Sequence, residues 1–170
     1  MAGGEPVGTP PIERTVVLGL GNPLLSDDAA GLAVADELER LLAERPIAGV
    51  EVARSSRGGF ELIDLLAGFQ RAVIVDALVT VDPCPGRVHR LEPAQVSGSA
   101  RLVGSHEVGL ATALELAEAL GIVMPETVTV YGVEAADVTT FAETPTPAVA
   151  AAIVRLAREL HESLAGGGPI

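Results

Sequence analysis

The clearest strand in the sequence is Ala72-Val73-Ile74-Val75-Asp76-Ala77-Leu78-Val79, a nearly continuous apolar run that contains one acid. This composition is typical of a strand buried on both faces of a parallel sheet. The run Thr15-Val16-Val17-Leu18-Gly19-Leu20 is a second β-rich segment. Segments with the apolar spacing of helices alternate with the strands. The chain therefore predicts an α/β sheet with helices on both faces.

The remaining elements follow from the same patterns. Further strands are expected at residues 50–53 and 127–133, and helical stripes at residues 34–42, 62–66, 110–120 and 149–164. Thr146-Pro147 predicts the start of the last helix, with a hydroxyl cap and proline in the first turn. The connection at residues 82–86 is too short for a parallel crossover, so residues 87–91 are expected to pair antiparallel with the previous strand. The sheet is thus predicted to be mostly parallel, with one antiparallel strand.

Length and composition restrict the organisation and the partners. The 170 residues suit one domain, expected at residues 15–164 between flexible tails at 1–14 and 165–170. The formal charge of -12 argues against nucleic acid or an anionic membrane as a partner. Because all 11 basic residues are Arg, P-loop and Schiff-base lysine chemistry is excluded. No apolar run is long enough for a membrane span, so the expected location is the cytoplasm.

Candidate functional residues follow the strands at their carboxyl ends, where α/β sheets bind ligands. Asp27 and Asp28 come after the first strand, Asp76 lies near the end of the third, and a Ser-rich loop delivers His106 to a helix start. Two aspartates and one histidine at one edge form a plausible three-ligand metal site with open positions. Glu134 follows the last strand. The residues thus predict a metal site at the carboxyl edge of the sheet.

Each of these residues also has a structural interpretation. A doubled acid at a helix start more often caps the helix, where acids interact well with the macrodipole, and this is the structural interpretation of Asp27 and Asp28. Asp76 is costly to bury unless it is paired, bound to a cation or bonded to loop amides. His106 is compatible with an ordinary helix start. His89 and Cys84 have no evident catalytic partner in the sequence and are left outside the predicted site.

Three segments together resemble the hydrogenase maturation proteases. Gly19-Leu20-Gly21-Asn22-Pro23-Leu24-Leu25-Ser26-Asp27-Asp28-Ala29-Ala30-Gly31 resembles the opening signature of this family. Val73-Ile74-Val75-Asp76-Ala77 matches its strand that ends in an acid, and His106-Glu107-Val108-Gly109-Leu110 matches its His-x-x-Gly-Leu element. The resemblance runs from about Thr15 to the last helix, in the family's order and spacing.

The resemblance implies a fold, an activity and a ligand set. The fold is a three-layer α/β/α sandwich of the phosphorylase/hydrolase-like type. The activity is that of an endopeptidase that removes the C-terminal extension of a NiFe hydrogenase large-subunit precursor after nickel insertion. Asp28, Asp76 and His106 would be both the metal ligands and the catalytic residues. The nickel would be carried by the substrate, and a surrogate divalent ion is able to occupy the same ligands.

Substrate contacts are expected at Asn22, Arg54, Arg57, Gly58 and Gly59. Many family members carry an Asp-Gly-Gly-Thr-like segment where Arg54-Ser55-Ser56-Arg57-Gly58-Gly59 stands here. The Gly58-Gly59 backbone would let a substrate tail approach closely. Asn22 either orients a ligand or forms a turn, and the two arginines either contact an acidic tail or are solvated.

Two other functions remain open at this stage. One is a metal-sensing assembly factor that docks on a hydrogenase subunit without cutting it, which would suit intact ligands beside altered substrate loops. The other is a small-molecule enzyme such as a nucleoside phosphorylase or hydrolase. The absence of lysine, the 2% aromatic content and the lack of a clear phosphate loop argue against the second.

Overall fold

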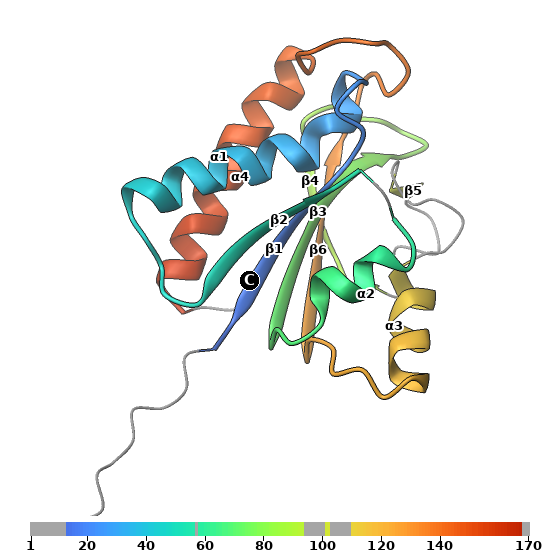
Figure 1. The fold of residues 1–170 in the computed structure, drawn as a ribbon. Helices are drawn as coiled ribbons and strands as arrows, with labels where there is room; N and C mark the ends of the chain where they lie inside the picture. The colour runs from blue at the N-terminus through green and yellow to red at the C-terminus, as the bar shows by residue number, and fades with distance from the viewer. Residues whose placement is uncertain (1–12, 57, 94–100, 103–109, 168–170) are drawn as a thin grey trace, which may run out of the picture.

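The computed structural model describes residues 13–56, 58–93, 101–102 and 110–167. The elements in chain order are β1 (Thr15–Leu20), the 3-10 turn η1 (Asp27–Ala29), α1 (Ala30–Glu44), β2 (Val50–Ser55), α2 (Glu61–Leu66), β3 (Arg71–Val79), β4 (Val88–Leu91), β5 (Arg101–Leu102), α3 (Leu110–Ala119), β6 (Thr127–Glu134) and α4 (Pro147–Ala165). Helices α1 and α4 cover one face of the sheet, and α2 and α3 cover the other (Figure 1). The three-layer α/β/α architecture is confirmed. The predicted terminal tails lie largely outside the described residues.

The strands of the sheet follow the order β2-β1-β3-β6-β4, and β5 pairs with β3. Strands β1, β2, β3 and β6 are parallel. The reversed direction of β4 is as predicted, but its neighbour is β6 rather than β3. The reason is that β6 pairs with β3 along Arg71–Leu78 and takes the place beside it. The short β5 adds an antiparallel pairing with Leu78 and Val79 that the sequence did not predict.

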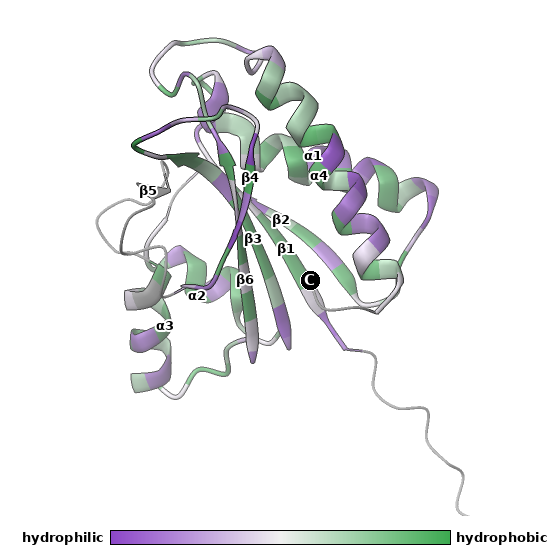
Figure 2. Cartoon of the chain, turned by 180° about the vertical axis from the view of Figure 1, so that it is seen from behind, coloured by the Kyte–Doolittle hydropathy of each residue, from purple (hydrophilic) through white to green (hydrophobic). Residues whose placement is uncertain are grey.

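The alternation of side chains along the strands divides the apolar interior into two cores. Val17, Val73 and Val75 belong to the core beneath α1 and α4. Ile74 and Leu78 belong to the core beneath α2 and α3. Figure 2 shows the apolar residues concentrated on the sheet and on the helix faces turned toward it. Because side chains two residues apart share a face, Asp76 is directed to the α2 and α3 side.

The strand order changes direction between β1 and β3. The chain proceeds from β1 outward to β2, and then returns to place β3 on the other side of β1. Such a switch point opens a crevice at the carboxyl ends of the two strands, and α/β proteins bind their ligands there. The helix that follows β1 starts at this point, so its first residues lie close to both strands.

Gly31 allows the first turn of α1 to rest on the backbone of β1 and β3. A Cβ atom at this position would lie 2.2 Å from the carbonyl oxygen of Val75 and 2.3 Å from that of Leu20. No side chain fits at such distances, so a glycine is needed for this packing. Gly31, the last residue of the first signature segment, therefore determines how closely α1 packs on the strands at the switch point.

Helix α4 begins where Thr146-Pro147 predicts it, with Thr146 as the residue before the helix. The Thr146 hydroxyl does not cap the helix. It donates to Asp27 Oδ2 at 3.0 Å, and the Thr146 N–H donates to Asp27 Oδ1 at 2.7 Å. A buried carboxylate is a stronger acceptor than a neutral oxygen, so the hydroxyl turns toward Asp27. Among the described residues, no helix has the length and apolar character needed to cross a bilayer.

Candidate active site at the switch point

Asp28 lies in η1, directly above the carboxyl end of β1. Its side chain is buried, and η1 contacts β3 as well as α1. Gly21, the first residue after β1, has a φ of +147°, and a Cβ there would lie 2.0 Å from the Asp28 carbonyl oxygen. Only glycine combines this φ with such a close approach. The Gly-x-Gly of the signature thus lets the loop fold back and bring Asp28 over the strand ends.

Asp76 is fully buried on β3 and faces the α2 and α3 layer. Its Oδ1 accepts the N–H of Ala77 at 2.7 Å. The residue beside it on β6 is Gly132, and Gly31 of α1 packs on the carbonyl of the preceding residue, Val75. Asp76, on β3, and Asp28, in the segment after β1, therefore both lie at the switch point.

A carboxylate that is ionised when buried needs a partner to offset its lost hydration, so a cation that binds both Asp28 and Asp76 would stabilise them. His106, the third predicted ligand, lies outside the described residues. The chain on either side of that stretch belongs to this end of β3, because Leu102 pairs with Leu78 and Leu110 packs in the same core as Leu78. Within the described residues, no group of three or more His, Cys, Asp or Glu is placed to hold a metal ion. Of the three residues predicted as ligands, the described part of the chain contains Asp28 and Asp76, both buried.

Asp27 has a different role from its neighbour. Its fully buried carboxylate accepts the N–H groups of Ala136, Asp137 and Thr146 at 2.7–3.0 Å and the Thr146 hydroxyl at 3.0 Å. Asp27 N–H in turn donates to the Asp137 carbonyl. These bonds tie the start of α1 to the loop between β6 and α4. Asp27 thus joins these two loops, a role that the sequence did not reveal, and its carboxylate bonds to the second loop instead of capping the helix.

The predicted substrate contacts are only partly brought to this edge. Asn22 Oδ1 accepts the N–H of Leu24 at 3.0 Å, so its side chain stabilises the turn after β1. Gly59 is buried with a φ of +77°, and Gly58 is partly exposed beside it, just past the end of β2. Arg57 lies outside the described residues. The two glycines and Asn22 therefore stand at the predicted edge.

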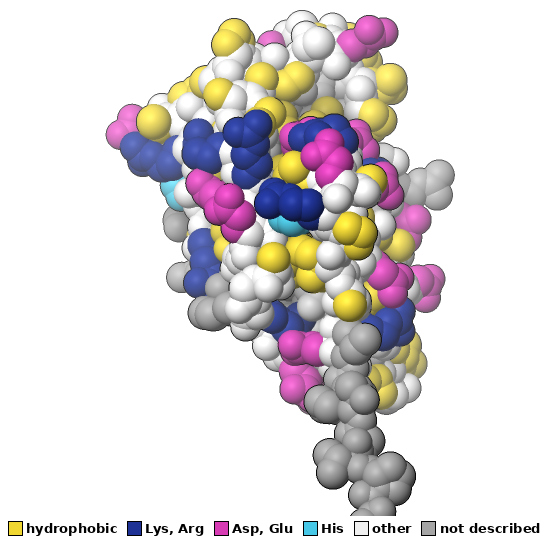
Figure 3. Space-filling view, turned by 90° about the vertical axis from the view of Figure 1, so that its left-hand side faces the viewer, with side chains coloured by type: hydrophobic (Ala, Val, Ile, Leu, Met, Phe, Trp, Pro, Cys, Tyr) yellow, Lys and Arg dark blue, Asp and Glu magenta, His cyan; other side chains and the backbone are white. Residues whose placement is uncertain are grey.

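Arg54 is directed away from Asp76. Its guanidinium contacts Asp36 and Glu39 of α1, each at 2.6 Å, on the opposite face of the sheet. Burial lowers the pKa of Arg54, but the hydrogen bonds to Glu39 and Asp36 outweigh this effect and raise it. Figure 3 shows arginines interleaved with acidic side chains over this face. Arg54 thus forms ion pairs with α1 and is not directed to the candidate site.

Glu134, at the carboxyl end of β6, is fully buried. Its carboxylate accepts the Thr80 hydroxyl and contacts His89 Nε2 at 3.1 Å. Burial raises the pKa of Glu134, but bonds from Thr80, His89 and the Cys84 backbone outweigh it and hold the pKa below its ordinary value. This cluster joins the β3–β4 connection to β6. The partner of His89 lies 45 residues away, so the sequence alone does not reveal it.

Comparisons with known proteins agree with this architecture. A family model described as HycI, hydrogenase maturation protease, matches residues 32–163. The Hydrogenase 2 maturation protease of Escherichia coli is 31% identical over 123 residues, which cover 71% of this chain and 72% of the relative. The solved structure of the hydrogenase maturating endopeptidase HybD from E. coli superposes with a TM-score of 0.73 at 28% identity, covering 91% of this chain and 94% of that one. The NiFe hydrogenase maturation protease HybD from Thermococcus kodakarensis gives 0.66 at 28% identity, over 89% and 99%. Because the family model spans most of the chain, this protein belongs to the hydrogenase maturation protease family.

Proposed function

We propose that this peptide hydrolase removes the C-terminal extension of a NiFe hydrogenase large-subunit precursor after nickel has been inserted. The observation that carries the proposal is the burial of Asp28 and Asp76 together at the switch point of the sheet. The relatives are named as proteases and endopeptidases, which favours cleavage over a non-cleaving assembly role. The proposed location is the cytoplasm, and the proposed partner is the precursor, not nucleic acid or a membrane.

The nickel enters this site as part of the substrate. Carboxylate oxygens and an imidazole form a suitable ligand set for a divalent ion of this kind, so Asp28, Asp76 and His106 would together recognise a nickel-loaded precursor. A metal ion held by these residues would polarise the scissile carbonyl or lower the pKa of an attacking water. In the second case, either aspartate is a candidate to accept the proton of that water. The glycine backbone at Gly58 and Gly59 leaves room for the substrate chain beside them.

The proposal is tested by incubating the protein with a nickel-loaded large-subunit precursor and following the precursor mass. Wild type is expected to release the tail. Asp76→Asn, which keeps the shape and removes the charge, is expected to lower the cleavage rate at least about a hundredfold. Asp64→Asn, an exposed position of α2, is the matched control and should cleave normally.

Different outcomes separate the alternatives. Full activity of Asp76→Asn would remove this residue from the mechanism. Binding of the precursor by wild type without any mass change would favour the assembly factor instead. A cadmium soak of the crystallised protein would show directly which side chains of the set contact the ion.

A further inference from the structure

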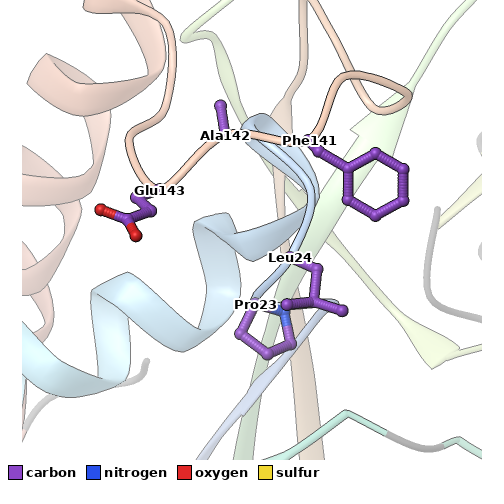
Figure 4. A pocket seen from close by; sticks show the side chains of 5 residues that line it. All are labelled: Pro23, Leu24, Phe141, Ala142 and Glu143. Atoms are coloured by element: carbon purple, nitrogen blue, oxygen red, sulfur yellow. The ribbon is translucent and has the colours of Figure 1, made fainter.

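A small apolar pocket lies at the same edge of the sheet as the candidate active site. Its cavity has a volume of about 260 Å³ and is lined by Pro23, Leu24, Phe141, Ala142 and Glu143. In Figure 4, the Pro23–Leu24 turn faces the 141–143 segment, and the carboxylate of Glu143 lies at the end away from the Phe141 ring. Pockets for drug-sized ligands measure roughly 300–1,000 Å³. The volume therefore suits a single side chain better than a cofactor.

The two walls of this pocket are joined rigidly to the segment that carries Asp28. Leu25 and Phe141 form an antiparallel β-bridge, and Ser26 N–H donates to the Thr140 carbonyl at 2.9 Å. The Ser26 hydroxyl donates to the Thr144 carbonyl, and Asp27 holds the base of the same loop. The wall at Leu24 is thus four residues from Asp28, along a segment whose residues 25–27 are bonded to the 137–144 loop. A side chain seated in the pocket would be held in a fixed position relative to the site.

Exposed apolar side chains gather at this edge of the molecule. Among the described residues, eight large hydrophobic side chains are exposed, and five of them follow or end the four parallel strands: Leu24, Phe60, Val79, Val81 and Phe141. Leu24 is 63% exposed and Phe141 is 78% exposed. Apolar surface concentrated around a site marks a protein interaction surface. A macromolecule that covers this edge would bury these side chains and reach the carboxylates in one docking event.

We propose that the Pro23–Glu143 pocket seats an apolar side chain of the precursor, next to a cationic group that pairs with Glu143. The occupant is the precursor because the pocket lies at the same edge of the sheet as the site that would cut it and is bonded to the segment that carries Asp28, so this inference rests on the proposed function. The aromatic ring of Phe141 and the side chain of Leu24 supply the contact area, as in the buried centre of a protein interface. Glu143 provides the opposite charge at the far end of the pocket.

The experiment compares Leu24→Ser and Phe141→Ser with Leu120→Ser in cleavage of the nickel-loaded precursor. Leu120 is an ideal control, because it is also a leucine, is also 63% exposed, and lies at the end of α3 near the opposite edge of the sheet. Both pocket variants are expected to raise KM at least about fivefold while kcat changes less than about twofold. Leu120→Ser should match wild type. Thermal unfolding of all variants verifies that the fold is retained.

The results distinguish this inference from the proposed function. Pocket variants that cleave like Leu120→Ser, or that lower kcat at constant KM, would overturn the pocket assignment while leaving the protease intact. If wild type itself does not cleave, the Kd for the precursor is measured instead. A rise in Kd of at least about fivefold confined to the pocket variants would then support the pocket although the peptidase proposal has failed, and equal Kd values would overturn both. Sedimentation that shows a wild-type dimer abolished by Leu24→Ser would identify a second copy as the occupant and overturn the inference.

Discussion

Asp27 and Asp28 are adjacent acids, and substitution of Asp27 tests the bonds that join the start of α1 to the loop between β6 and α4. In Asp27→Asn, the amide oxygen is expected to take the place of Oδ2, which accepts three of the four bonds. The NH2 group then faces the Thr146 N–H, so that bond is lost and two donors oppose each other. A bond to a charged group contributes about 1.5–3 kcal/mol and a neutral bond about 1 kcal/mol. Losing one bond and weakening three removes at least about 3 kcal/mol. Since single substitutions rarely exceed about 5 kcal/mol, the expected destabilisation is about 3–5 kcal/mol.

The measurement is urea and thermal unfolding followed by far-UV circular dichroism, since the chain has no Trp. For a domain of this size, the expected loss corresponds to a fall in Tm of about 6–20 °C. Asp28→Asn is expected to eliminate cleavage, as the proposed role of its carboxylate requires. Asp64→Asn again provides an exposed control. An Asp27→Asn variant that unfolds within about 0.5 kcal/mol of wild type would refute the assignment of Asp27 as the tie between the loops.

Three further substitutions test the surrounding structure. Gly31→Ala should lower the free energy of unfolding by about 2–3 kcal/mol and also slow cleavage, because the new Cβ would force α1 away from the strand backbone. The control is Gly166→Ala, which should be neutral in the same unfolding assay because no atom lies closer than 3.5 Å to the added Cβ. Glu134→Gln should lower the free energy of unfolding by about 2–3 kcal/mol at pH 7. The pKa of Glu134 is depressed in the folded state, so that stabilisation is present above pH 4.5 and is lost as the pH falls through the lower pKa of the folded protein. The free energies of unfolding of wild type and variant should therefore converge in acid. A constant difference between them across this pH range would contradict the assignment of the Glu134 cluster. Arg54→Gln should leave kcat/KM unchanged, because its guanidinium is engaged with Asp36 and Glu39; a clear loss would return Arg54 to the substrate contacts.

Much of the architecture was predictable because it depends on local patterns. Apolar runs with alternating faces identify the strands, and apolar stripes of helical spacing identify the helices that cover them. An acid inside the apolar run at residues 72–79 and a glycine-rich turn after the first strand both mark the carboxyl edge. The parallel arrangement then brings that edge together, since every parallel strand ends on the same side.

Polar partnerships were decided only by the tertiary structure. Asp27 is separated from Ala136 and Thr146 by 109 and 119 residues, and nothing in the local sequence distinguishes it from Asp28. The same is true of β4, whose neighbour depends on where β6 enters the sheet, and of Arg54, which meets α1 across the sheet. An apolar side chain needs only an apolar surface to pack against. The spacing of apolar residues along the sequence specifies which face of a strand or helix that surface is. A buried polar atom needs a particular partner at hydrogen-bond distance, and only the folded chain determines which residue that is.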